Sequence, residues 1–445
     1  MLPVVGPLLL GWASASTHRT LGDGSLPFPS SVAFSWATVQ PFFHADNITG
    51  PYSEEAIAEI AKFPLVTLEK WHGACEGFVP ANKDDACPSI GKDAYPCCEE
   101  KRMVADLQRV KAINPNASTV MYFNMVLDFP QYELHHQMLA NPHWALALPN
   151  GSRCQMSGDS GPATKNPDPE GRPGTLGGMD IFDFAQPEVV DAFVAACVGP
   201  VRAGQADGCF LDRAISCVPT NACALGESGC LMCPYLSAAH KQAWNDGHAA
   251  VLAKIQEGIG AEKPLIANHA TALNSTNAAQ LENFFQGETG GVAGIKALLD
   301  CTANNKLCEA HFTIGSDCAN ITNPLAAFLI GAGRQAYFGC GAWHVHDTTG
   351  KLSVGKWHHC FDKKLGEPVG AVKVSGPQPG CNASWMDPSA PWSARAANNC
   401  SFERRFASGT VVTFDGATNT GGIAWAGDAL LGVDPAHSCD TAGPP

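Results

Sequence analysis

Short apolar runs alternate with longer segments of helical periodicity through the first 360 residues of the chain. Runs typical of strands lie at residues 31–36, 65–71, 118–125, 207–212, 264–268, 284–288, 309–314 and 336–343. Segments with apolar residues at helical spacing lie between them, at residues 53–62, 99–114, 131–140, 187–203, 238–256, 292–301 and 324–335. This alternation is typical of parallel βα units, and eight such units match the size of a (β/α)8 barrel. We therefore predict an α/β fold, a (β/α)8 TIM barrel.

The pattern changes after residue 360. Short alternating runs at residues 402–406, 410–414 and 422–425 are separated by Gly, Asp and Asn, which is typical of antiparallel hairpins. We predict a barrel over residues 16–360, with Cys-rich loop inserts, and a small antiparallel β domain over residues 361–445. A doubly wound fold is disfavoured, because no glycine-rich dinucleotide turn follows the first predicted strand.

The start of the chain resembles a secretory signal. An apolar run at residues 2–12 precedes Ala13, Ser14 and Ala15, a small-residue cleavage pattern, so we expect a signal peptide over residues 1–15. No later stretch is long and apolar enough to predict a membrane span. Seven glycosylation sequons support the eukaryotic secretory pathway; they begin at Asn47, Asn116, Asn150, Asn274, Asn320, Asn382 and Asn399.

The chain has 19 Cys, and in a secreted protein most of them are expected to form disulfides. Two clusters lie in the predicted loops after the second and fourth strands: Cys75, Cys87, Cys97 and Cys98, and Cys217, Cys223, Cys230 and Cys233. The spacing of the last two residues also fits a zinc site, an alternative that secretion disfavours. The odd number leaves one thiol unpaired in a monomer, and we expect this to be Cys209, inside an apolar run.

Charge excludes some partners. With 28 Lys and Arg against 42 Asp and Glu, the formal net charge is −14, so a nucleic acid or an anionic membrane is a poor partner. Hydrophobic residues make up 45% of the chain, enough for a large core. We expect a monomer.

Catalytic groups of a barrel lie at the carboxyl ends of its strands. Asp212 ends the predicted fourth strand, with Arg213 beside it, and Glu288 ends the predicted sixth strand next to two glycines. The alternative interpretations are a turn cap for Asp212 and a solvated loop residue for Glu288. Glycoside hydrolysis requires two carboxyl groups, one as proton donor and one as nucleophile or base. We predict Asp212 as the nucleophile or base and Glu288 as the proton donor.

Other strand ends carry groups that suit a sugar site. Aromatic rings stack on sugar rings and polar groups hydrogen-bond hydroxyls, although core packing explains any single one equally well. Glu69 is the second choice for a catalytic carboxylate and Asp128 the third. The predicted substrate-binding residues are Glu69, Lys70, Trp71, Tyr122, Asn124, Arg213, Asn268, His269 and Trp343, with Trp36 and His72 as further candidates.

Three segments carry a resemblance to a known group of proteins. They are DIFDFAQPEVVDAFV (residues 180–194), ADGCFLDRA (206–214) and KPLIANHA (263–270), and LGEPVG (365–370) with FERRFASGTVVTFDG (402–416) matches the β domain that follows such barrels. Together they resemble uncharacterised glycoside-hydrolase-like (β/α)8 families and, more remotely, glycoside hydrolase family 114. The resemblance implies that Asp212 is the catalytic fourth-strand Asp and that Glu288 matches a sixth-strand acid. Arg213 and the Cys-rich insert depart from the family pattern.

We therefore predict a secreted glycoside hydrolase that acts on a poly- or oligosaccharide and needs neither an organic cofactor nor a metal. Two alternatives stay open at this point. One is a catalytically inactive barrel that binds glycan, and the other is a metal-dependent hydrolase that uses His344 and His346 after the eighth strand.

Overall fold

The computed structural model describes residues 26–47, 51–70, 72, 99–129, 132–147, 151, 153–156, 179–214, 236–268, 271, 273–286, 290–313, 318–345, 352, 355–390, 392–428 and 434–440. The predicted signal peptide, both Cys clusters of the predicted loops, Trp71, His269 and Glu288 lie outside these residues.

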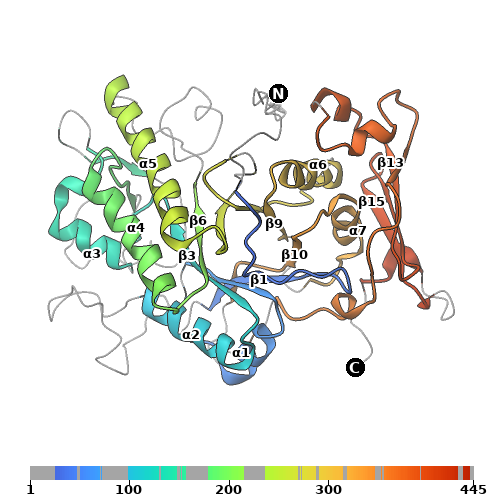
Figure 1. Ribbon diagram of the computed structural model, residues 1–445, viewed down its shortest axis with the longest axis horizontal. Coiled ribbons are helices and arrows are strands. Elements are labelled where there is room, and N and C mark those ends of the chain that lie inside the picture. The colour runs from blue at the N-terminus through green and yellow to red at the C-terminus, as the bar shows by residue number, and fades with distance from the viewer. Residues whose placement is uncertain are drawn as a thin grey trace, which may run out of the picture.

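Eight parallel strands form a barrel, as the hydrophobic pattern predicts (Figure 1). Each strand pairs with the next in chain order, and a bridge between Pro41 and Phe338 brings the last strand beside the first. The strands are β1 (Phe42–Asn47), β2 (Leu65–Leu68), β3 (Ser118–Asn124), β6 (Gly208–Asp212), β7 (Leu265–Asn268), β8 (Ala278–Leu281), β9 (Leu307–Phe312) and β10 (Ala336–Cys340). A short strand, β11 (His344–Val345), pairs with the end of β1.

Helices lie around the strands and pack in neighbouring pairs, α1 with α2, α4 with α5 and α6 with α7 (Figure 1). Ser53 and Ser237 cap α1 and α5 by accepting backbone N–H groups of the first turn. The helices are α1 (Glu54–Ile60), α2 (Glu99–Ile113), α3 (Glu133–Ala140), α4 (Pro187–Arg202), α5 (Ala238–Ile259), α6 (Gly290–Ala303) and α7 (Thr322–Gly331). The strands β4 (Gln155–Met156) and β5 (Met179–Asp180) pair antiparallel in a separate two-stranded sheet.

The C-terminal residues form a separate antiparallel sheet, which confirms the second part of the predicted fold. Its strands are β12 (Lys373–Ser375), β13 (Ser401–Arg405), β14 (Val411–Asp415) and β15 (Thr420–Ala424). The sheet packs on α7. Arg404 of β13 donates to the backbone carbonyls of Leu329, Ile330 and Ala332, groups at the C-terminus of α7 that have no partner within the helix.

The prediction for the first strand is wrong. Residues 31–36 are bends and irregular backbone, and β1 begins at Phe42. The apolar positions of the predicted strand are buried elsewhere: the Trp36 ring packs on Phe406 and lies 5.5 Å from the Arg404 guanidinium of the C-terminal sheet. The true strand carries the buried polar residues His44, Asp46 and Asn47, which made the segment look unlike a strand.

The prediction for the sixth strand is also wrong. β8 is Ala278–Leu281, whereas Phe284 and Phe285 lie in a turn where Phe285 has a φ of 67°. Their rings bury apolar surface outside the barrel, Phe284 near Phe328 and Phe285 near Phe414 of the C-terminal sheet. The aromatic pair that suggested a strand therefore lies in a turn, where it packs outside the barrel. The strand itself, β8, is a short run of mainly small residues.

Five disulfides join described cysteines, in agreement with the expectation that most Cys are oxidised. The expectation that Cys209 stays unpaired is wrong, because it is bonded to Cys197 of α4. Both residues face the same buried layer between β6 and α4, so burial protects a disulfide here rather than a thiol. The other pairs are Cys301–Cys308, Cys318–Cys340, Cys360–Cys439 and Cys381–Cys400.

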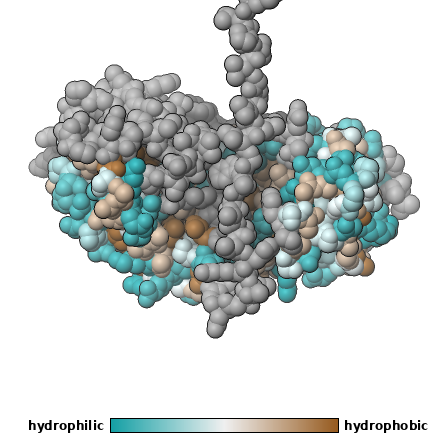
Figure 2. Space-filling model, turned by 90° about the horizontal axis from the view of Figure 1, so that it is seen from above, coloured by the Kyte–Doolittle hydropathy of each residue, from teal (hydrophilic) through white to brown (hydrophobic). Residues whose placement is uncertain are grey.

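Hydrophilic and apolar side chains are interspersed on the face that Figure 2 shows. Among the described residues, the large hydrophobic side chains that stay exposed are Ile113 and Val369, which lie on different parts of the chain. Every described helix is too short or too polar to cross a lipid bilayer.

Candidate active site

Asp212 ends β6 at the barrel mouth, and its carboxylate accepts four hydrogen bonds. On the neighbouring strand β3, Tyr122 Oη donates to Asp212 Oδ2 at 2.6 Å and Asn124 Nδ2 donates to the same oxygen at 3.1 Å. The other oxygen, Oδ1, accepts from Asn268 Nδ2 at 3.0 Å and from the backbone N–H of Arg213 at 2.8 Å. Parallel register explains the convergence, because Asn124 lies directly opposite Asp212.

These partners favour the ionised form of Asp212. Burial alone raises the pKa of a carboxyl group, but the positive charge of Lys70 and the hydrogen bonds from Asn268 and Tyr122 outweigh it, so that the pKa of Asp212 lies below its ordinary value. The charge of Arg213 acts in the same direction. Asp212 therefore carries a negative charge at neutral pH, as a nucleophile or base must.

Arg213 contacts Asp212 through its backbone as well as acting through its charge. Its φ of 54° is unusual for a residue with a side chain, and such backbone costs about 1 kcal/mol or more. The turn aims the Arg213 N–H back at Asp212. Strained backbone that orients a donor toward a buried carboxylate is a feature of functional sites.

A second carboxylate, that of Glu282, lies next to Asp212, and sequence reasoning missed it. Glu282 directly follows β8, and its Oε2 accepts from Asn268 Nδ2 at 2.6 Å. The same nitrogen donates to Asp212, so one amide bridges the two carboxyl groups. The signal was present in the sequence, an acid after the run AAQL, but that run is short and contains a Gln at its centre.

A third carboxylate, Glu69, lies after β2 and is paired with Lys70. Lys70 Nζ is 3.1 Å from Glu69 Oε2 and lies over the Tyr122 ring, 4.8 Å from its centroid. Glu69 is 4% exposed and Tyr122 is fully buried, so the ammonium group is held at the edge of the same cluster as Asp212. The structure thus brings together the predicted residues Glu69, Lys70, Tyr122, Asn124, Asp212, Arg213 and Asn268.

Trp343 follows β10 and lies next to the end of β1. Its backbone carbonyl accepts from Asp46 N, which ties it to the end of β1. Its half-buried ring lies 3.7 Å from the His311 ring and 4.9 Å from the His44 ring, measured between centroids. The predicted stacking of Trp343 on a sugar stays a prediction.

Three candidates lie away from the cluster. Trp36 packs on the C-terminal sheet. His72 is fully buried, and its Nε2 pairs with Asp106 Oδ2 of α2 at 2.9 Å, so it joins a helix to the barrel wall. Asp128 pairs with His135 Nδ1 of α3 at 2.6 Å.

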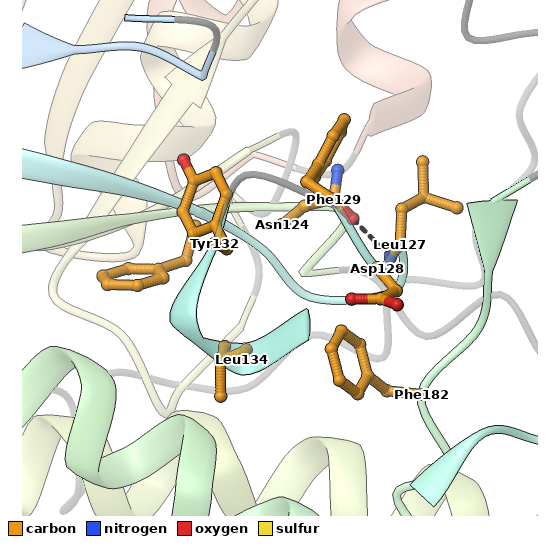
Figure 3. A pocket seen from close by; sticks show the side chains of 8 residues that line it. Asn124, Leu127, Asp128, Phe129, Tyr132, Leu134 and Phe182 are labelled. Carbon is orange, nitrogen blue, oxygen red and sulfur yellow. Dashed lines mark hydrogen bonds between the residues drawn. The ribbon is translucent and has the colours of Figure 1, made fainter. Parts of the chain in front are cut away.

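A small pocket opens on the other side of Asn124 (Figure 3). Asp128 is its one charged residue, and the remaining lining is mainly apolar: Phe123, Leu127, Phe129, Tyr132, Leu134 and Phe182. Asn124 Oδ1 accepts from the backbone N–H groups of Val126 and Leu127, which fixes its amide so that Nδ2 faces Asp212. The walls of this pocket therefore orient a residue of the site.

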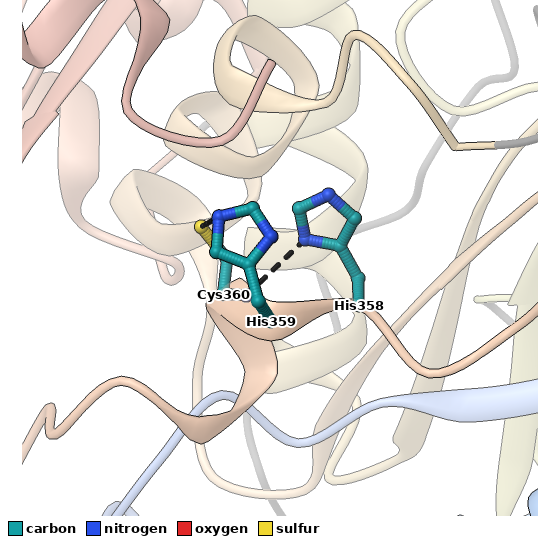
Figure 4. Close-up of side chains that lie close together, drawn as sticks. All are labelled: His358, His359 and Cys360. Atoms are coloured by element: carbon teal, nitrogen blue, oxygen red, sulfur yellow. Dashed lines mark hydrogen bonds between the residues drawn. The ribbon is translucent and has the colours of Figure 1, made fainter. Parts of the chain in front are cut away.

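One group of side chains among the described residues is compact enough for a metal ion: His358, His359 and Cys360 (Figure 4). Cys360 is bonded to Cys439, so its sulfur is not the thiolate that a metal binds. The His346 residue of the metal-dependent alternative, and the side chain of His344, lie outside the described residues.

A family model described as hypothetical glycosyl hydrolase family 15 matches residues 111–410, more than half of the chain. The chain belongs to hypothetical glycosyl hydrolase family 15. The family match covers six of the eight barrel strands, β3 and β6 to β10, together with β12 and β13 of the C-terminal sheet. Membership in hypothetical glycosyl hydrolase family 15 supports the predicted glycoside hydrolase and the glycoside-hydrolase-like barrel; the resemblance to family 114 stays a prediction.

Solved structures that are similar to this chain include glycosidases, each with low sequence identity to it. They are an ER glucosidase II heterodimer (9% identity, TM-score 0.44, 73% of this chain and 33% of that chain), a GH31 dextranase of Flavobacterium johnsoniae (12%, 0.45, 72% and 37%) and a noncanonic maltogenic α-amylase from Thermotoga neapolitana (9%, 0.41, 84% and 85%). The chain spans about a third of the length of the first two. No curated protein matches the sequence.

Proposed function

We propose that the protein is a secreted glycoside hydrolase that cleaves O-glycosidic bonds of an oligo- or polysaccharide, with Asp212 as nucleophile and Glu282 as proton donor. The observation that carries the proposal is the Asn268 amide, which donates to both carboxyl groups at the barrel mouth. Two carboxyl groups at such short separation are the machinery that glycoside hydrolysis requires.

The shared amide also favours retention of anomeric configuration. Asn268 Nδ2 lies 3.0 Å from Asp212 Oδ1 and 2.6 Å from Glu282 Oε2. Even if these two hydrogen bonds were collinear, the two carboxyl oxygens would be closer together than the about 6.5 Å at which inverting pairs begin. A separation of about 5–5.5 Å leaves no room for a water molecule and suits direct attack by one carboxylate.

The two carboxyl groups then have different roles. Asp212 is held ionised by Lys70, Asn268 and Tyr122, which suits attack on the anomeric carbon. Glu282, which follows β8, then gives its proton to the leaving oxygen as Asp212 attacks and the glycosidic bond breaks. In the second step Glu282 takes a proton from water, the resulting hydroxide attacks the anomeric carbon, and the bond to Asp212 breaks.

The remaining polar groups of the cluster suit a carbohydrate. Lys70 places an ammonium group over Tyr122 at the edge of the cluster, and Trp343 offers an aromatic ring beside His44. Disulfides within the barrel and the C-terminal sheet support an oxidising, extracellular location.

A panel of oligo- and polysaccharides incubated with the purified full chain tests the proposal. We expect hydrolysis by the wild type, and Asp212→Asn and Glu282→Gln each to lower kcat at least about 10²-fold with folding retained. Glu403→Gln, a carboxylate of the C-terminal sheet, is the matched control and keeps wild-type turnover. Product anomers followed by NMR immediately after cleavage are expected to have the configuration of the substrate.

The variants also separate the alternatives. Glu288→Gln tests the donor that the sequence predicts; loss of turnover there, with Glu282→Gln active, assigns the proton to Glu288. Binding to a glycan without cleavage indicates an inactive glycan-binding barrel. Activity that survives both Asp212→Asn and Glu282→Gln contradicts the two-carboxylate mechanism.

A further inference from the structure

A line of buried polar side chains crosses the barrel interior beneath the candidate site. Gln280 of β8 places its Nε2 2.8 Å from His44 Nδ1 on β1, and His44 Nε2 lies 3.4 Å from Glu69 Oε1 after β2. Gln280 is 1% exposed, and the His44 side chain is fully buried. The interior of a TIM barrel is normally filled by branched apolar side chains, so this polar line requires an explanation.

The hydrogen bonds fix one tautomer of His44. The Gln280 amide nitrogen also donates to Glu309 Oε2 at 2.9 Å, so both of its hydrogens are directed, one at Glu309 and one at His44. An amide nitrogen only donates, and therefore His44 Nδ1 is the acceptor and carries no hydrogen. Burial and the charge of Lys70 lower the pKa of His44 to about 3, so the ring is neutral and its single N–H is on Nε2.

That N–H faces Glu69 from the barrel interior, while Lys70 holds Glu69 from the mouth. Lys70 Nζ lies 3.1 Å from Glu69 Oε2, and its charge is the largest influence that lowers the pKa of Asp212. Glu69 thus has the Lys70 ammonium group on one side and the His44 Nε2–H on the other, where it lies 3.4 Å away without forming a hydrogen bond, and both neighbours restrict the positions of the carboxylate. The neutral histidine adds no positive charge that competes with Lys70 for Glu69.

We propose that Gln280 and His44 are positioning residues: they fix Glu69, and through it Lys70, so that the ammonium group stays beside Asp212. The inference deepens the proposed function, since it rests on Asp212 acting as the ionised carboxylate. The other charged or titratable groups that face Asp212 are Tyr122, Arg213 and Glu282, and His44 also faces His311, Asp212 and Glu282.

Two NMR measurements on the full chain test the proposal without substrate. In protein labelled with ¹⁵N-histidine, the His44 ring, identified by its absence in His44→Gln, is expected to show an unprotonated Nδ1 and a protonated Nε2. In Gln280→Met, which keeps the length of the side chain but not the donor, we expect a mixture of tautomers.

The second measurement follows the Asp212 carboxyl carbon during titration, identified with Asp212→Asn. Its midpoint is expected to rise by about 1 pH unit in Gln280→Met and in His44→Phe, because the ammonium group moves away. His44→Gln is the matched rescue: its amide nitrogen reaches the position of Nε2 and keeps an N–H beside Glu69, so the midpoint stays at the wild-type value. Gln280→Met retains the imidazole and decides the question if His44→Phe fails to fold.

A hydrogen on His44 Nδ1 in the wild type overturns the fixed tautomer. A wild-type midpoint in both Gln280→Met and His44→Phe overturns the positioning role, and so does a shift in His44→Gln as large as that in His44→Phe. Failure of the wild type to hydrolyse any glycan affects only the proposed function, because neither measurement uses a substrate.

Discussion

Tyr122 donates a hydrogen bond of 2.6 Å to Asp212 across the boundary between two neighbouring barrel strands. Burial and the nearby charge of Asp212 raise the pKa of Tyr122 well above its ordinary value, so its hydroxyl keeps its hydrogen and remains a donor over the physiological pH range. Tyr122 thus stabilises the Asp212 anion as a neutral hydrogen-bond donor that keeps its own hydrogen.

Removing this hydroxyl is expected to narrow the pH range of activity. In Tyr122→Phe the ring stays packed on Phe210, with which it is stacked at 5.6 Å, but Asp212 loses one donor to its charged form. The pKa of Asp212 rises, and the acidic limb of kcat/KM moves to higher pH by about half a unit or more. A pH profile unchanged from wild type would show that the bond does not influence the ionisation of Asp212.

Lys70 is expected to have the larger effect, since its charge comes before the hydrogen bonds among the influences that lower the pKa of Asp212. Lys70→Met keeps the aliphatic length over Tyr122 and removes the charge. We expect the acidic limb of kcat/KM to move to higher pH by more than in Tyr122→Phe. High salt should reduce this shift less than it would for an exposed ion pair, because salt screens buried charges less. The comparison of both profiles at two ionic strengths measures this.

The buried Glu309 is expected to make the protein less stable in alkali. Burial raises the pKa of Glu309 to about 8 from an ordinary value of 4.5, so the folded state favours the protonated form. Its contribution to stability is complete below about pH 4.5 and declines as the pH rises toward 8. Denaturant unfolding between pH 5 and 9 is the measurement, and Glu309→Gln should flatten this decline; equal slopes in both proteins contradict the assignment.

The Cys197–Cys209 disulfide should be present in the purified protein. Non-reducing peptide mapping is expected to find the two cysteines linked. Cys209→Ser is expected to lower the free energy of unfolding by about 2–4 kcal/mol, with Cys381→Ser in the C-terminal sheet as a comparison. Alkylation of Cys209 in the unfolded, unreduced wild type would show a free thiol instead.

The sequons differ in whether the fold leaves room for a glycan. Asn47 ends β1 and is fully buried, so a glycan there is incompatible with the closed barrel, whereas Asn116, Asn274, Asn320 and Asn382 are exposed. If the chain passes through a eukaryotic secretory pathway, glycopeptide mass spectrometry is expected to find glycans among these four exposed sites and none at Asn47. An occupied Asn47 in folded protein would contradict the placement of β1.

The sequence predicts the fold well where burial follows a single periodicity. The run from Gly208 to Asp212 and the helix before it are apolar and regular, and both lie where the pattern places them. The first strand could not be found in this way, because His44 and Asp46 face a polar barrel interior and interrupt its apolar pattern.

The candidate site was predictable in part for the same reason. Asp212, Asn124 and Asn268 each end a correctly predicted strand, so their convergence follows from the barrel alone. Glu282 was missed because the strand before it was assigned a few residues too late, at the aromatic pair Phe284 and Phe285. The interior residue Gln280 carries no local signal, since its role depends on Glu309 of the adjacent strand β9 and on His44 of β1, both remote in the sequence.

The hydrogen bonds from Arg404 to the C-terminus of α7 affect how the protein unfolds. The carbonyls that it satisfies belong to a barrel helix, while the arginine belongs to the C-terminal sheet, and burial holds its guanidinium against Trp36 from the start of the described chain. Detaching the sheet would leave those carbonyls and a buried cation without partners at once. We therefore expect the two parts to melt in one cooperative transition, so that a calorimeter records one peak where two separable domains would give two.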